Sequence, residues 1–358
     1  MRPHPDHPDA ALKNWLIVGT NNNHWPANAD AAVLDRAVTV LEGILSQAGA
    51  VGGGGDGDGA WWVGEAAEVA AARWTEDSSW ETRDVFVRLA AAVLANGAAD
   101  PADQPSGEAC LGVLVGAMGD ANLMARASAA RIAASLARSA GSAGAAVADV
   151  LAANDAVQAL LVDPDESVRA AGVDLAAVLV EAGRGASPSP LRAFLTENEN
   201  GRAVMDRLRA DLDWEVRAAT VGLAARLLSA ASPACSDPWV GHAAAIVTAA
   251  LADEDSTGVV WRALETAADL TDCEPFAKAT AAAAIDLEAA VEGARERAGR
   301  SEQAAGLYPI PTVLDADSQA RAFAGGHHGH GGFGGFGATV FAGGNASDGE
   351  DAAPRDCY

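Results

Sequence analysis

An aspartate stands six residues before an arginine in four segments of this chain, and the four arginines recur at intervals of 43, 43 and 48 residues. The pairs are Asp77 with Arg83, Asp120 with Arg126, Asp163 with Arg169, and Asp211 with Arg217. Apolar residues also stand six and ten positions after each arginine, at Leu89 and Val93, Ile132 and Leu136, Leu175 and Leu179, and Leu223 and Leu227. A period of about 40–47 residues is typical of HEAT and armadillo helical repeats. The pattern therefore predicts an all-α solenoid of the HEAT/armadillo type, a fold that usually serves as a binding scaffold.

The composition agrees with a helical array and limits its partners. Half of the 358 residues are hydrophobic but only 5% are aromatic, and alanine, the best helix former, is abundant. The net charge of −25 repels a phosphate backbone, so we expect a basic protein partner and no direct contact with nucleic acid. No apolar window is long enough to span a bilayer and no signal peptide is visible, so we expect no membrane contact. Four cysteines without a CxxC pair favour a reducing compartment, which predicts a soluble intracellular protein.

We expect three regions along the chain: an N-terminal extension over 1–59 with one helix (31–48) and a Gly-rich linker (52–59), the HEAT-repeat array over 60–300, and a disordered tail over 301–358. In the array, the second helix of each unit is predicted over 80–95, 123–140, 166–182 and 214–231, and first helices over 107–118, 145–162 and 190–210. A degenerate fifth unit over 238–270, in which Asp255 stands seven residues before Arg262, and a capping helix over 275–298 complete the array.

The recurrent aspartates and arginines are predicted to hold the repeats together rather than to act on a ligand. Each aspartate falls at the turn between two helices, where a carboxylate can accept hydrogen bonds from the N–H groups of the following helix. Each arginine falls in the first turns of that helix, where the helix dipole opposes a cation, so it requires a carboxylate partner. An aspartate of the same unit or of the neighbouring unit meets this requirement. A ladder of such pairs would fix the stacking register.

The C-terminal region is acidic and too poor in apolar residues to fold alone, with seven acidic residues against two basic ones over 301–358. Its few aromatic residues, Phe336 and Phe341 among them, could dock on a partner. His327, His328 and His330 could hold zinc or nickel weakly, but no second cluster of ligands is near in the sequence. The whole chain shows no nucleophile elbow and no phosphate-binding loop. We therefore expect no enzymatic activity and no cofactor of the chain's own.

Three strings and the terminus carry a resemblance to a known family. The strings are Trp80 to Asp84 (WETRD), Asp163 to Ala170 (DPDESVRA) and Asp211 to Ala218 (DLDWEVRA, which includes Trp214), and the chain stops at Asp356-Cys357-Tyr358. In this order they resemble the BRCA-associated ATM activator family of HEAT-repeat proteins. The resemblance covers about residues 75–230 and the last ten. Members of that family are considerably longer, with further repeats N-terminal to this region.

The resemblance implies a partner and a place of action. Proteins of that family bind the catalytic endonuclease subunit of the Integrator RNA-processing complex, a two-zinc metallo-β-lactamase enzyme, with its paralogous subunit alongside. It also implies a nuclear and cytoplasmic location and a link to DNA-damage kinase signalling. The family's tail reaches into the nuclease site, so the resemblance implies that Asp356, Phe336 and Phe341 contact the partner. It places Cys357 and Tyr358 at the zinc that the partner supplies.

The chemistry of the terminus is compatible with this role. A thiolate is a strong zinc ligand, at about 2.3 Å, but one cysteine cannot build a site, so another protein must supply the remaining ligands. Asp351, Asp356 and the terminal carboxylate disfavour the Cys357 thiolate in the free protein, which is the opposite of what a nucleophilic cysteine needs. A metal ion on the partner reverses this balance. Two alternatives stay open: a general HEAT adaptor for transport or complex assembly with an inert tail, and an enzyme.

Overall fold

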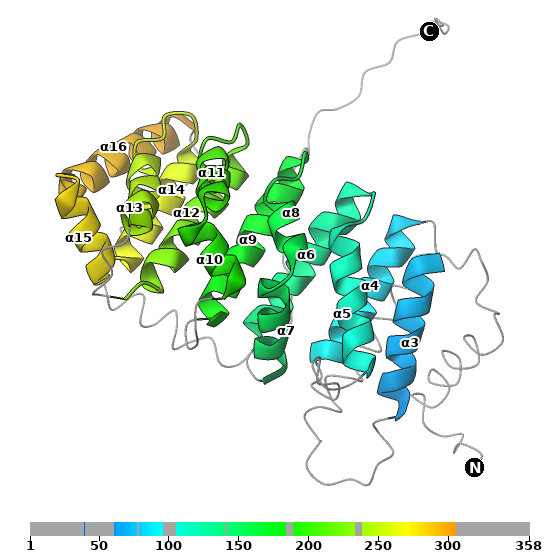
Figure 1. Cartoon of the computed structure of the whole chain (residues 1–358). Helices are drawn as coiled ribbons and strands as arrows, with labels where there is room; N and C mark the ends of the chain where they lie inside the picture. Colours follow the sequence, from blue (N-terminus) through cyan, green and yellow to red (C-terminus); the bar gives the residue numbers. More distant parts are fainter. Residues whose placement is uncertain are drawn as a thin grey trace, which may run out of the picture. The chain divides into compact units, whose positions relative to one another are not determined.

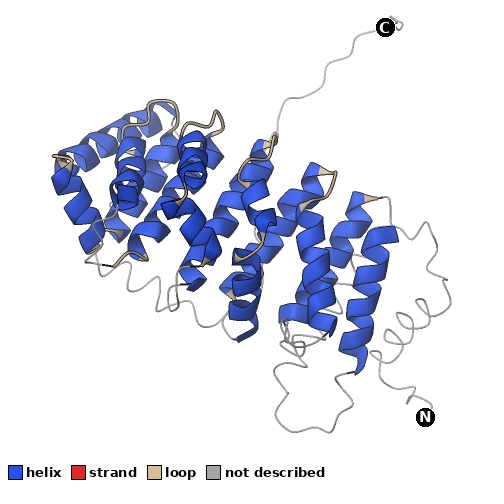
Figure 2. Ribbon diagram, viewed as in Figure 1, coloured by secondary structure: helices blue, strands red, loops and turns tan. Residues whose placement is uncertain are grey.

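The computed structural model describes Thr39 and residues 61–76, 79–95, 105–139, 142–183, 189–232 and 238–305. The chain divides into two units, Met1–Leu307 and Tyr308–Tyr358, and all described residues belong to the first. Apart from Thr39, the helix expected over 31–48 lies outside the described residues, as do the linker over 52–59 and the tail beyond 305. The described residues form helices and the turns between them, with no strand among them (Figure 2). The fold of this part is an all-α solenoid, as the repeat pattern predicted.

The helices follow one another in antiparallel sets. They are α3 (Trp61–Glu76), α4 (Trp80–Ala95), α5 (Pro105–Met118), α6 (Leu123–Arg138), α7 (Ser142–Ala152), α8 (Asp155–Leu160), α9 (Glu166–Ala182), α10 (Pro190–Glu197), α11 (Glu199–Arg209), α12 (Trp214–Ser229), α13 (Pro238–Ala250), α14 (Thr257–Asp269), α15 (Glu274–Ala282) and α16 (Leu287–Ala305). Helices α4, α6, α9, α12, α14 and α16 pack side by side in one layer, each on the next (Figure 1). The remaining helices form the second layer and pack on the first, except that α15 packs mainly on α13.

The core lies between the two layers and is built largely from small side chains. Helix α6 is the extreme case, because all of its fully buried residues except Leu136 are alanines. Alanine is the best helix former, and its small side chain lets neighbouring helices pack closely. Larger groups such as Leu151, Leu175 and Met205 fill the space between layers. Low aromatic content is therefore compatible with a continuous core across the described helices. None of these helices is long and apolar enough to cross a membrane.

Three predicted helices are each divided in two. The helix predicted over 145–162 is interrupted before Asn154, whose side chain accepts a hydrogen bond from the Ala156 N–H and starts α8. The helix predicted over 190–210 is divided in the same way at Asn198, which caps α11 through the Asn200 N–H. An asparagine side chain competes with the helix for backbone donors, and this competition ends one helix and starts the next.

The third division separates α15 from α16, where one capping helix was predicted over 275–298. Ala284 has a φ of 53°, in the left-handed region. The Ile285 N–H donates to the Thr280 carbonyl at 3.0 Å and the Ala284 N–H donates to the Ala281 carbonyl at 3.1 Å. This hydrogen-bond pattern is a Schellman motif, which normally has glycine at the left-handed position. Because alanine occupies this position here, no residue type marks the helix end in the sequence.

Candidate functional site

The turns between the two layers are organised by an aspartate and by a capping residue two positions later. In the turn before α6, a carboxylate oxygen of Asp120 accepts a hydrogen bond from the Asn122 N–H at 2.8 Å. The Asn122 side chain in turn accepts bonds from the N–H groups of Met124 and Ala125, so Asn122 is the N-cap of α6. Asp163 with Asp165, and Asp211 with Asp213, repeat this arrangement. The predicted role of the recurrent aspartate is thus corrected: the aspartate orders the turn, and the residue two positions later caps the helix.

The recurrent arginine joins two neighbouring turns. Arg126 donates from Nε and Nη2 to the two carboxylate oxygens of Asp163, at 2.8 and 2.9 Å. Its remaining nitrogen, Nη1, donates to the backbone carbonyls of Asp120 and Ala121 at 2.8 and 3.2 Å. The guanidinium plane therefore contacts its own turn with one nitrogen and the next unit's turn with the other two. A planar, five-donor group is suited to such a bridge, and an ammonium group is not.

We call the series of these pairs the ladder: Arg83 with Asp120, Arg126 with Asp163, Arg169 with Asp211, and Arg217 with Asp253. Every one of these pairs joins successive units, so the carboxylate partner is in the neighbouring unit and not in the arginine's own. The first three are bidentate with donor–acceptor distances of 2.8–3.0 Å, and the last is longer, at 3.0 and 3.4 Å. Asp77, at the start of the pattern, lies outside the described residues.

The ladder groups are largely shielded from water. The arginine side chains are 11–18% exposed and the aspartate side chains 5–13% exposed. For Asp120 and Asp211, burial acts to raise the carboxyl pKa. The hydrogen bonds from Arg83 and Arg169 and from the turn N–H groups act more strongly in the opposite direction, so both pKa values fall below the ordinary value. The hydrogen bonds that Arg126 and Arg169 donate to the carboxylates of Asp163 and Asp211 raise the pKa of both arginines. These four groups are charged at neutral pH.

The ladder ends at Asp253, which corrects the predicted alignment of the fifth unit. Asp253 accepts the bonds from Arg217 and also those from the Asp255 and Ser256 N–H groups, so it is the ladder residue and Asp255 is not. The position six residues after Asp253 is Val259, which cannot continue the series. Arg262 lies instead against α12, with its Nη2 3.0 Å from where a side-chain carbon on Gly222 would be.

Trp214, predicted as a structural residue of the repeat, lies at the start of α12 and reaches the next unit. Its ring would be 2.6 Å from a Cβ placed on Gly258, so glycine is required there for the close approach. The indole is still 47% exposed. The predicted tail residues Phe336, Phe341, Asp356, Cys357 and Tyr358, and the histidines His327, His328 and His330, lie outside the described residues. Among the residues that are described, no group of three or more His, Cys, Asp or Glu could hold a metal ion.

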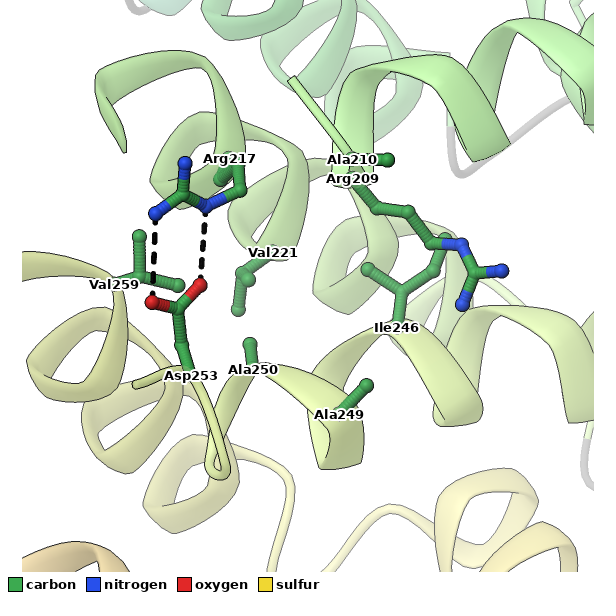
Figure 3. Close-up of a pocket in the computed structure, with 9 residues that line it drawn as sticks. All are labelled: Arg209, Ala210, Arg217, Val221, Ile246, Ala249, Ala250, Asp253 and Val259. Atoms are coloured by element: carbon green, nitrogen blue, oxygen red, sulfur yellow. Dashed lines mark hydrogen bonds and ion pairs between the residues drawn. The ribbon is translucent and has the colours of Figure 1, made fainter. Parts of the chain in front are cut away.

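A small cavity lies at the end of the ladder, and sequence reasoning missed it. Its volume is about 180 Å³, and it is lined by Arg209, Ala210, Arg217, Val221, Ile246, Ala249, Ala250, Asp253 and Val259. Figure 3 shows the Arg217–Asp253 pair on one side and Arg209 on the other, with apolar side chains between them. The signal for this cavity in the sequence was Val259, which stands where the earlier repeats have an arginine. Its short side chain leaves unfilled space beside Asp253.

The geometry defines a helical-repeat protein whose recurrent charged residues join neighbouring units. No protein-family model and no curated protein matches this chain. A solved structure, described as that of an engineered protein, is similar with a TM-score of 0.42 and 17% sequence identity, over 80% of this chain and 97% of that one.

Proposed function

We propose that this chain is a non-enzymatic scaffold that binds another protein and carries its C-terminal Cys357 to a zinc ion of that partner. The observation that supports the scaffold part is the ladder. Its arginines and aspartates use their hydrogen-bonding groups on each other and on the turn backbone. Groups satisfied in this way stabilise a fixed stacking of the repeats and are not available for acid–base chemistry. A fixed array is suited to presenting a surface.

The zinc-capping part of the proposal rests on the terminus and on the family resemblance. The sequence carries Asp356, Cys357 and Tyr358 in an acidic stretch, and a single thiolate can complete the coordination of a metal that a partner already holds. The acidic surroundings disfavour the thiolate until a cation is near, so Cys357 would bind metal on the partner rather than react beforehand. The partner that this chemistry fits is a two-zinc endonuclease of the Integrator type. The chain would hold this enzyme inactive or accompany it during assembly.

The experiment compares the full chain with three variants in binding to that endonuclease and in inhibition of RNA cleavage. Deletion of Cys357 and Tyr358, and separately Cys357→Ser, should weaken binding and restore cleavage, whereas the matched thiol control Cys235→Ser should change neither. With cobalt in the nuclease, the full chain should add a sulfur-to-metal charge-transfer absorption that Cys357→Ser lacks. Unchanged affinity and unchanged cleavage in both tail variants would refute the capping role.

A general adaptor with an inert tail is the second candidate, favoured by the array itself, which offers a binding surface without any contribution from the tail. It predicts that all partner contacts lie on the helical array. Partner capture from cells would then be the same for the full chain and for a chain that lacks its last ten residues.

A further inference from the structure

The large apolar side chains that the described residues expose all lie on the ladder turns. They are Leu123 (39% exposed), Met124 (46%), Val162 (51%), Leu212 (99%) and Trp214 (47%). Each stands within four residues of a ladder aspartate. We call the four turns at 120–124, 162–166, 211–215 and 252–256 the ladder edge; they follow one another along the upper side of the array in Figure 1. Large apolar side chains gathered on one edge, and exposed nowhere else among the described residues, indicate an interaction surface.

The same edge is strongly acidic. Its four turns contain ten aspartates and glutamates and no lysine or arginine. Four of the ten are ladder aspartates, neutralised by ladder arginines. The other six, Asp165, Glu166, Asp213, Glu215, Glu254 and Asp255, stand outside the ladder. A ligand for this edge must therefore bring positive charge together with apolar groups.

The spacing of the units along the edge fits a bound peptide segment in one backbone conformation better than in others. Packed helices lie about 8–10 Å apart, so successive turns of the edge are separated by about that distance. A polyproline II segment advances about 3.1 Å per residue and completes a turn every three residues, or about 9 Å. An apolar side chain at every third residue of such a segment would meet successive turns of the edge. The cavity beside the last ladder pair, with Val221, Ile246 and Val259 in its lining, can receive one of these side chains.

We infer that the ladder edge binds a basic, extended segment of a partner protein with an apolar side chain at every third position. Leu212 and Val162 are its most exposed anchoring contacts, and the six carboxylates outside the ladder attract its cations. This inference rests on the proposed scaffold role and is independent of zinc capping by the tail. Loss of the tail leaves peptide binding at the edge unchanged, and loss of the edge leaves sulfur coordination at the partner's zinc unchanged.

The test measures binding of the full chain to a synthetic peptide of four Leu-Pro-Lys repeats by fluorescence anisotropy. Binding should weaken by at least about tenfold when Leu212→Ser and Val162→Ser are combined, because two apolar contacts are lost. These side chains project into solvent, so the fold should be retained, as circular dichroism will show. The charge-neutral control, Glu181→Ser with Arg226→Ser, removes an exposed ion pair of the α9–α12 surface and should leave the affinity unchanged.

Two further peptides separate the contributions of charge and apolar contact. Replacement of lysine by glutamate in the peptide should abolish binding, and replacement of leucine by serine should weaken binding at least as much as Leu212→Ser combined with Val162→Ser does. The inference is overturned if the Leu-Pro-Lys peptide does not bind, if the edge variant binds it as tightly as the native chain, or if the serine peptide binds equally well.

Discussion

Arg126 and Asp163 lie in neighbouring units, 37 residues apart in the sequence, and are joined by two parallel hydrogen bonds of 2.8 and 2.9 Å. Arg126 also donates to the carbonyl of Asp120 in its own turn. One side chain thus determines the spacing between two turns and their relative position along the array. Four such pairs in series make the stacking of successive units depend on a few planar, charged contacts.

Removal of one ladder carboxylate should destabilise the array well beyond the effect of an ordinary surface ion pair. Asp163→Ala leaves the shielded Arg126 guanidinium without its partner, which should lower the free energy of unfolding by about 2–4 kcal/mol in urea denaturation. The matched control is Glu181→Ala, which breaks the Arg226 pair between α9 and α12, where both side chains are over 40% exposed. That change should cost less than about 1 kcal/mol. Equal losses would mean that the ladder has no special role.

The stability of the ladder should decrease in acid. The pKa of Asp120 and of Asp211 is lowered in the folded chain, because hydrogen bonds to the carboxylate outweigh the opposing effect of burial. A lowered folded pKa contributes stability that is fully present above the ordinary aspartate pKa of about 3.9 and is lost as the pH falls through the folded value. The difference in unfolding free energy between the native chain and Asp120→Asn should therefore be constant above about pH 5 and shrink below about pH 4. A difference that grows in acid would contradict this assignment.

Ala284→Gly should stabilise the end of α15. An alanine at a φ of 53° has a Cβ penalty that glycine does not, and the left-handed position of a Schellman motif favours glycine. We expect a gain of about 0.5–1 kcal/mol, measured by thermal and urea unfolding. Ala277→Gly is the control, because the same substitution at an exposed position inside helix α15 should be destabilising by a similar amount. A loss at both positions would show that the φ of Ala284 is not left-handed in solution.

The Cys110 thiol should be inert in the folded array. It is completely buried, and burial raises its pKa to about 12. Because the thiolate is the reactive form, alkylation of Cys110 by iodoacetamide should proceed only as fast as the array opens. Peptide mass spectrometry can follow each cysteine separately, with the partly buried Cys273 as the internal comparison. Rapid labelling of Cys110 under native conditions would show that α5 is not packed as described.

The first-layer helices, which include α4 and α9, were predicted well because their local signals agree with their packing. The predicted bounds at 80–95 and 166–182 are those observed for α4 and α9. Asp165 caps the start of α9, and Gly183 follows its end, so short-range sequence signals mark both ends. The recurrence of Arg83 and its equivalents also predicted the need for carboxylate partners.

What could not be predicted depends on the stacking of units. The choice between an aspartate of the same unit and one 37 residues later depends on how far the arginine reaches across the interface. The end of the ladder at Asp253 was obscured because Asp255 and Arg262 resemble the pattern at a different spacing. The division at Ala284 has no glycine or asparagine to mark it. The tail residues on which zinc capping depends, Cys357 and Tyr358, stay predictions.

The most direct test of the account is a double-mutant cycle on Arg126 and Asp163, with Arg126→Ala, Asp163→Ala and the combined variant measured by urea unfolding. The cycle removes the separate contribution of Asp163 to its own turn, where it accepts the Asp165 N–H. We expect a coupling energy of about 1.5–3 kcal/mol between the two side chains. A coupling energy below about 0.5 kcal/mol, within the range expected of independent sites, would contradict the claim that the ladder holds successive repeats in register.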